Sequence, residues 1–218
     1  MVRLDILSDP ICPWCYIGRT LLGQALAERP DHPFEIHWQP FRLNPEMPAE
    51  GMDRRAYLEG KFGGPEAAAE AYAPVRERAA EAGLEIDFDA IARTPATTDA
   101  HRLLHWAEVE GCQDAVALAL FGAYFHEGRD ISDREVLADI ADSHGIDAGL
   151  IARLLASDAD IDEVTGRDAQ FREMGVTGVP TFIVAGQHAV PGCQPPEMWT
   201  RVIDEMAGQA AGSAGRGG

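Results

Sequence analysis

The chain has 218 residues, of which 46% are hydrophobic, so it can bury a core of domain size and is not a disordered protein. Its net charge of −18 and pI near 4.6 mean that it repels phosphate backbones and anionic lipid surfaces. Composition therefore argues against nucleic acids and membranes as partners.

The amino-terminal sequence predicts a βαβ unit. Apolar residues alternate with polar ones over residues 2–6 and again over 34–39, a pattern that is typical of strands. Between them, residues 14–29 carry apolar side chains at helical spacing, and Pro30 ends the helix. No signal-peptide core precedes the first strand, so we expect a cytoplasmic protein.

The motif Cys12-Pro13-Trp14-Cys15 stands where the first predicted strand gives way to the helix. Two cysteines with this spacing at a helix start lie one turn apart, close enough to form a disulfide. The free N–H groups and the dipole of the helix favour a thiolate at Cys12, and the Cys15 thiol can resolve a mixed disulfide formed there. The motif predicts a redox-active dithiol.

Half of a zinc site is the rival interpretation of the same motif. The remaining cysteines, Cys112 and Cys193, are isolated, and no second closely spaced pair of cysteine or histidine residues follows. We therefore expect no metal. Four cysteines are also too few for a disulfide-stapled secreted scaffold. We expect Cys112 and Cys193 to be small apolar residues without a chemical role.

Strand signals vanish over residues 53–157, which we expect to form an inserted all-helical domain. Residues 115–125 are apolar almost all round and predict a buried central helix. Ser132 and Glu135 fit a capping box at the start of a further helix. The run of alanine and glutamate over residues 66–82 predicts a helix exposed to solvent.

The carboxyl-terminal part predicts a hairpin and a last helix. Strand character returns at residues 181–184 and 187–190, on either side of a turn. The helix begins near Pro195 and carries an apolar stripe as far as Gly208.

The order of these elements predicts an α/β protein with a thioredoxin-like fold, interrupted by a large all-helical insertion between its βαβ and αββα halves. The two halves comprise residues 1–52 and 158–208, and the insertion lies between them. Residues 209–218 are small and rich in glycine, so we expect a disordered tail.

Three stretches carry a resemblance to a known family: SDPICPWCYIG (residues 8–18), PFRLNP (residues 40–45) and GVTGVPTF (residues 175–182). With them the chain resembles the DsbA-like family of thioredoxin-fold disulfide oxidoreductases, and within it the FrnE-type branch. The resemblance runs over nearly the whole chain, and the first and third stretches together are specific.

The resemblance implies roles for four residues. Cys12 would be the nucleophile and Cys15 the resolving thiol, shielded one turn deeper. Pro180 would form the cis-proline loop that faces the dithiol, an arrangement that fold context must impose. The backbone of Val179 would then lie beside Cys12, where it can pair with a substrate.

Three further residues are candidate substrate contacts. Pro13 and Trp14 would tune the couple from within the motif, and neither brings a charge, which leaves the redox direction open. His101 and His105 share a helical face. The resemblance places their helix at the border of the active site, with His101 against the substrate.

We therefore expect a thiol–disulfide oxidoreductase that acts on protein or small-molecule thiols and disulfides, with no bound cofactor and with glutathione as redox partner or co-substrate. A homodimer is the expected assembly. The first alternative is a glutathione-dependent isomerase or transferase, similar to 2-hydroxychromene-2-carboxylate isomerases and kappa-class glutathione transferases. The second is a non-catalytic module that binds peptides or acts as a chaperone.

Overall fold

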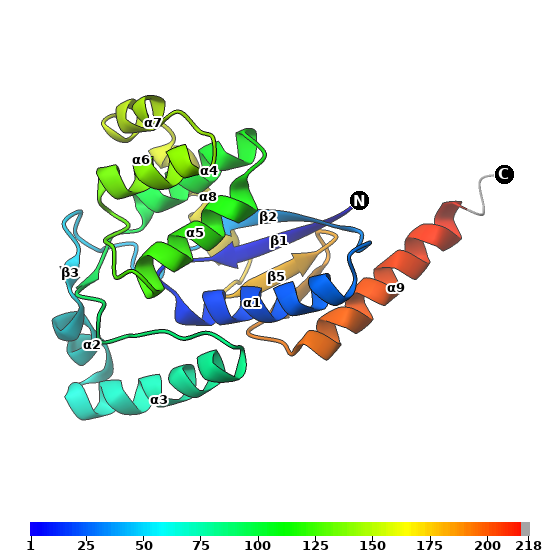
Figure 1. The fold of residues 1–218 in the computed structure, drawn as a ribbon, viewed down its shortest axis with the longest axis horizontal. Helices are drawn as coiled ribbons and strands as arrows, with labels where there is room; N and C mark the ends of the chain where they lie inside the picture. Colours follow the sequence, from blue (N-terminus) through cyan, green and yellow to red (C-terminus); the bar gives the residue numbers. More distant parts are fainter. Residues whose placement is uncertain (215–218) are drawn as a thin grey trace.

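The computed structural model describes residues 1–214, with side chains described as far as Gly208 (Figure 1). Four strands form a mixed sheet in the order β2-β1-β5-β6. Their bounds are β1 Val2–Ser8, β2 Phe34–Pro40, β5 Thr181–Val184 and β6 His188–Pro191. β1 pairs parallel with β2 and antiparallel with β5, which forms a hairpin with β6. The predicted βαβ unit and hairpin are confirmed.

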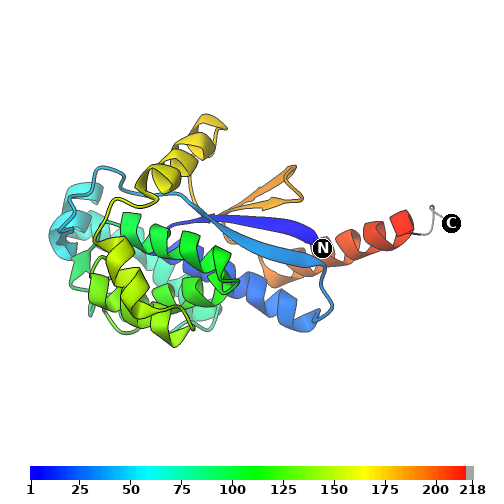
Figure 2. The same ribbon diagram turned by 90° about the horizontal axis from the view of Figure 1, so that it is seen from above.

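Helices surround this sheet on both faces. They are α1 Pro13–Glu28, α2 Arg54–Phe62, α3 Pro65–Glu81, α4 Thr98–Val109, α5 Gln113–Phe125, α6 Arg134–Ser143, α7 Ala148–Leu155, α8 Ile161–Glu173 and α9 Pro196–Ala214. α1 and α9 pack against each other, and Figure 2 shows α8 on the opposite side of the sheet from α1. The central strand β1 is thereby buried on both faces from Leu4 to Ser8. Among the described residues, no helix has the length and apolarity that crossing a bilayer requires.

The segment between β2 and β5 is mostly helical, but the prediction of an all-helical insertion is wrong in one respect. Two short strands, β3 (Met52–Asp53) and β4 (Arg93–Thr94), pair antiparallel as a separate two-stranded sheet. They bring the start of α2 beside the segment that leads into α4. The predicted central helix is confirmed as α5, in which Val116, Leu120 and Phe121 are among the buried residues.

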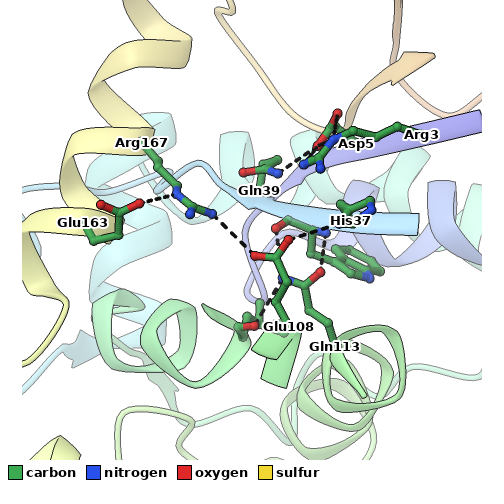
Figure 3. Close-up of polar contacts among 10 residues, drawn as sticks. Arg3, Asp5, His37, Gln39, Glu108, Gln113, Glu163 and Arg167 are labelled. Atoms are coloured by element: carbon green, nitrogen blue, oxygen red, sulfur yellow. Dashed lines mark hydrogen bonds and ion pairs between the residues drawn. The ribbon is translucent and has the colours of Figure 1, made fainter. Parts of the chain in front are cut away.

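Polar side chains attach the inserted helices to the sheet (Figure 3). The Glu108 carboxylate of α4 lies 3.0 Å from Nδ1 of His37 on β2 and 3.6 Å from Nη1 of Arg167 on α8. At the start of α5, Oε1 of Gln113 accepts a hydrogen bond of 2.8 Å from the backbone N–H of Trp38. The Gln113 amide donates in return to the Trp38 carbonyl at 3.1 Å. These bonds fix β2 between α4, α5 and α8.

Two predicted helix boundaries are wrong. Asp133, not Ser132, is the N-cap of α6, because its carboxylate accepts the backbone N–H of Glu135 at 2.8 Å. The Ser132 hydroxyl donates to Asp130 instead. At the other end of the chain, α9 continues past Gly208 to Ala214, where a disordered tail was expected. Residues 215–218 of that expected tail lie outside the described residues.

Candidate active site

The central strand of the sheet delivers Cys12 to the start of α1. After β1 ends at Ser8, a tight turn forms in which the Cys12 N–H donates to the Asp9 carbonyl at 2.9 Å. Cys12 is the N-cap of α1 and Pro13 its first helical residue, a position at which the missing N–H of proline costs nothing. The Cys12 carbonyl accepts from the N–H of Cys15 at 3.1 Å. The two cysteines of the motif therefore stand one above the other in the first turn.

The two thiols of the motif differ in their environment. Both are free, Cys12 is 3% exposed and Cys15 is completely buried. Burial, with the adjacent Cys12 sulfur as the second cause, holds the pKa of the Cys15 thiol well above its ordinary value. Cys15 is therefore a protonated thiol at neutral pH, and it lies behind Cys12, whose thiol can contact a ligand.

The loop before β5 faces Cys12. The peptide bond between Val179 and Pro180 is cis, and the carbonyl oxygen of Val179 lies 3.9 Å from the Cys12 sulfur. The Pro180 carbonyl accepts from the Gly192 N–H at 2.8 Å, which ties the loop to the end of β6. A Cβ at Gly18 would lie 3.0 Å from the Pro180 ring. Glycine thus allows the close approach of α1 to this loop.

Two cavities open beside the dithiol. The larger, of about 500 Å³, lies between α3 and the loops on either side of the β5–β6 hairpin. Its lining residues are Trp14, Pro74, Glu77, Arg78, Glu81, Val179, Pro180, Gly192 and Cys193. The smaller, of about 290 Å³, includes Cys12 and Pro13 in its wall and extends between α2 and α3. Trp14 and Val179 line both cavities.

The structure gathers the residues of the motif and of the facing loop around the two cavities, but it places His101 elsewhere. His101 is 3% exposed and is not among the residues that line either cavity. Its Nε2 atom lies 4.0 Å from Asp9 Oδ1, on the inner side of the turn that carries Cys12. The predicted substrate contact of His101 is therefore not part of the site that the structure forms.

Asp9 anchors that turn from within. Its completely buried carboxylate accepts hydrogen bonds from the backbone N–H of Leu43 at 2.7 Å and of Ile11 at 3.3 Å. Desolvation nevertheless dominates and raises the pKa of Asp9 to about 6. Asp9 joins the first and second family stretches of the sequence, which explains why they meet at the site.

Because Asp9 and His101 are both buried, we expect the stability of the protein to depend measurably on pH. Burial lowers the pKa of His101 to about 3, below its value in the unfolded chain, so its contribution to stability is lost as the pH falls from about 6.5 towards 3. Asp9 acts in the opposite sense, because its raised pKa adds stability as the pH falls through about 6. His101→Asn removes only the first contribution.

Between pH 7 and pH 4, the wild type is expected to lose about 3 kcal/mol of unfolding free energy relative to His101→Asn. Urea titrations of both proteins at the two pH values measure this difference. The volume change of the substitution cancels, because it is the same at each pH. A difference that does not vary with pH would mean that His101 titrates normally in the folded protein.

Cys193 lies closer to the dithiol than its isolation in the sequence suggests. Its thiol donates to the Trp14 carbonyl at 3.0 Å, within the first turn of α1. Burial, and next the nearby Cys12, raises the pKa of Cys193 to about 12. The Cys193 thiol is therefore protonated and serves as a hydrogen-bond donor. The remaining cysteine, Cys112, is the N-cap residue of α5. Among the described residues, no group of cysteine, histidine or acidic side chains could hold a metal ion.

Comparison with known proteins identifies the family of the chain. A profile of the family described as "DSBA-like thioredoxin domain" matches residues 3–204. The "Uncharacterized protein YwbO" of Bacillus subtilis (strain 168) is 25% identical over 206 residues, which are 94% of this chain and 96% of that protein.

Two solved structures are also similar. The "probable DsbA oxidoreductase SCO1869" from Streptomyces coelicolor is 31% identical, with a TM-score of 0.82 over 95% of this chain and 91% of that one. The fold is shared with the "cytosolic disulfide reductase DsbM from Pseudomonas aeruginosa with GSH", at 19% identity and a TM-score of 0.67 over 94% and 98% of the two chains. Because the family match spans nearly the whole chain, this protein belongs to the DsbA-like family of thioredoxin-fold proteins.

Proposed function

We propose that this protein is a thiol–disulfide oxidoreductase that cycles Cys12 and Cys15 between dithiol and disulfide. One observation carries the proposal: the two cysteines lie three positions apart in the first turn of α1, with Cys12 at a cavity wall and Cys15 completely buried behind it. A nucleophile needs contact with substrate, whereas a resolving thiol needs contact only with the nucleophile. The family of the chain supports the same chemistry.

The Cys12–Cys15 couple can reduce or oxidise a client, and two electrons are transferred in each case. In reduction of a client, the Cys12 thiolate attacks the client disulfide and forms a mixed disulfide, and one client sulfur leaves as thiolate. Cys15 then loses its proton, attacks Cys12 and releases the second client thiolate, so the protein gives up two electrons. In oxidation, a client thiolate opens the Cys12–Cys15 bridge and a second client thiol resolves the mixed disulfide.

Val179 supplies the docking group for a substrate backbone. Its N–H has no hydrogen-bond acceptor among the described residues, and its carbonyl faces the Cys12 sulfur at 3.9 Å. An extended peptide can therefore pair with this residue while its cysteine meets Cys12. Glutathione, a short peptide thiol, is the proposed redox partner. A structural neighbour of similar fold, DsbM, was solved with GSH.

A redox titration tests the proposal. The protein is equilibrated in buffers of reduced and oxidised glutathione, quenched by alkylation and weighed by mass spectrometry. We expect two thiols to disappear together, in one two-electron transition that maps to Cys12 and Cys15. Cys112→Ser is the matched control, because that residue lies at the start of α5 and should leave the transition unchanged. If Cys12 and Cys15 never pair across the titration, the proposal is wrong.

The smaller cavity favours a second candidate function. A space of about 290 Å³ beside Cys12 suits a small molecule, as in a glutathione-dependent isomerase or transferase. Such an enzyme needs one activating residue and no resolving thiol. Full activity of Cys15→Ser with saturable glutathione binding would favour this candidate over the oxidoreductase.

A further inference from the structure

Arg54 is a buried cation that no acidic side chain neutralises. The residue is 5% exposed, and none of the described carboxylates lies within ion-pair distance of its guanidinium. Its neighbour Arg55, by contrast, is exposed and paired with Glu59 at 2.7 Å. Since an unpaired buried charge is strongly unfavourable, the surroundings of Arg54 favour an anion from outside the chain.

Two tyrosines hold the Arg54 guanidinium in place. Nη1 donates to the Tyr124 hydroxyl and Nη2 to the Tyr72 hydroxyl, each at 3.0 Å. The Tyr124 hydroxyl donates onward to the Arg93 carbonyl at 3.1 Å. These bonds orient the guanidinium without neutralising its charge.

Three donors near this guanidinium are left unused. Arg54 Nε and Thr94 Oγ1 are buried and have no hydrogen-bond partner. The Tyr72 hydroxyl accepts from Arg54, but its own proton has no acceptor among the described side chains and backbone. Buried donors without acceptors are rare in folded proteins, and here two of them come from α2 and β4, with a third free donor on the half-buried Tyr72 of α3.

Arg54, Tyr72 and Thr94 line the same cavity of about 290 Å³ that contains Cys12. Much of the remaining wall is apolar, and includes Ile11, Leu43, Leu58, Phe62, Ala71 and Val75. The cavity therefore combines a cationic, donor-rich part, an apolar wall and a nucleophilic sulfur. A cavity with this lining fits a ligand with the matching three parts.

We propose that this cavity binds the carboxylate of a small apolar or aromatic thiol or disulfide and presents the sulfur of that ligand to Cys12. The guanidinium, the Tyr72 hydroxyl and the Thr94 hydroxyl bind the carboxylate, and the apolar wall covers the body of the molecule. The reaction at Cys12 rests on the proposed function, whereas the carboxylate site does not.

Two aromatic disulfides, one with carboxylates and one without, test the proposal. The first, 5,5′-dithiobis(2-nitrobenzoate), carries a carboxylate on each ring, and the second, 4,4′-dithiodipyridine, is neutral. In both reactions, Cys12 thiolate displaces one aryl thiolate, then Cys15 attacks Cys12, loses its proton and releases the other. The protein loses two electrons and the probe gains them. Stopped flow gives a rate constant for each probe. The rate constant for the carboxylated disulfide divided by that for the neutral one isolates recognition of the carboxylate from the reactivity of the thiol.

Arg54→Met is expected to lower this ratio by about tenfold to a hundredfold, because a charged hydrogen-bond partner of the carboxylate is lost. Thr94→Val, which keeps shape and removes only the hydroxyl, is expected to lower it by about threefold to tenfold. Arg55→Met is the matched control: it removes the same charge one residue away, from outside the cavity lining, and should leave the ratio within about twofold.

Binding without chemistry separates the two proposals. Phenylacetate is titrated by calorimetry into Cys12→Ser protein, with and without Arg54→Met, and saturable binding that Arg54→Met abolishes is expected. An unchanged ratio in Arg54→Met, or binding that does not depend on Arg54, overturns the carboxylate site and leaves the oxidoreductase in place. Arg54-dependent binding in a protein whose Cys12 and Cys15 never pair would support the carboxylate site and overturn the oxidoreductase.

Discussion

Cys12→Ser is expected to lower the rate of disulfide reduction by at least about 1,000-fold, because a serine hydroxyl cannot replace the thiolate nucleophile. Cys15→Ser keeps the nucleophile and removes the group that resolves its product. This variant is expected to accumulate a mixed disulfide at Cys12. Reduction of insulin by dithiothreitol, followed by turbidity, measures the first effect, and intact-mass spectrometry measures the second.

Cys112→Ser serves as the control for both variants, since it removes a thiol at the start of α5 and should keep the wild-type rate. Retention of full activity in Cys12→Ser would overturn the role of the dithiol. A stable mixed disulfide at Cys193 in place of Cys12 would contradict the assignment of the nucleophile. That outcome is not expected, because burial raises the pKa of Cys193 to about 12.

Arg102→Leu is expected to lower the unfolding free energy by about 3 to 5 kcal/mol. The side chain is 1% exposed, and its guanidinium donates to the backbone carbonyls of Leu154, Ser157 and Ala159 at 2.6 to 2.8 Å. These carbonyls belong to the end of α7 and the turn towards α8. Leucine fills much of the space but leaves the Ser157 and Ala159 carbonyls without a donor among the described residues, whereas the Leu154 carbonyl keeps the Ser157 hydroxyl at 2.8 Å. Chemical denaturation measures the loss.

The control for this prediction is Arg29→Gln. Arg102 pairs with Asp99 at 2.7 Å, and Arg29 forms a similar arginine–carboxylate pair with Asp204 at 2.9 Å, but both side chains of the second pair are exposed. Such pairs contribute about 1 kcal/mol or less. Equal losses in the two variants would show that Arg102 contributes no more than a surface arginine does.

The regular part of the fold could be predicted because its elements are long enough to show a period. β1 alternates apolar and polar residues over Val2–Ile6 and β2 over Phe34–Gln39, and α5 is apolar on nearly every side. β3 and β4 have two residues each, so no pattern can reveal them. At α6, Ser132 and Asp133 are both good capping residues, and only the backbone conformation decides between them.

The sulfur chemistry of the site could be predicted, because Cys12, Cys15 and Pro180 lie in compact motifs. The ligand-facing residues could not. Arg54 sits in the charged run Asp53-Arg54-Arg55, which is typical of an exposed surface. Its burial results from pairing between β3 and β4 and from tyrosines far away in the sequence.

The burial of part of α3 could not be predicted from the sequence either. Its alanine and glutamate content predicts an exposed helix, yet Val75 and Ala79 are buried, and Tyr72 and Arg78 line the two cavities. α3 packs against α1, but its buried residues Ala68, Val75 and Ala79 are small and contribute a weak periodic signal.

The two walls of the site have different origins in the chain. Cys12 and the Val179 loop follow and precede two directly paired strands, β1 and β5, so their separation is set by the spacing within the sheet. The opposite wall comes from α2 and α3, which lie outside the sheet (Figure 1). Substitutions in α2 and α3 can therefore change which molecules reach the sulfur while the redox centre keeps its geometry. Relatives with the same dithiol can thus evolve different substrate preferences.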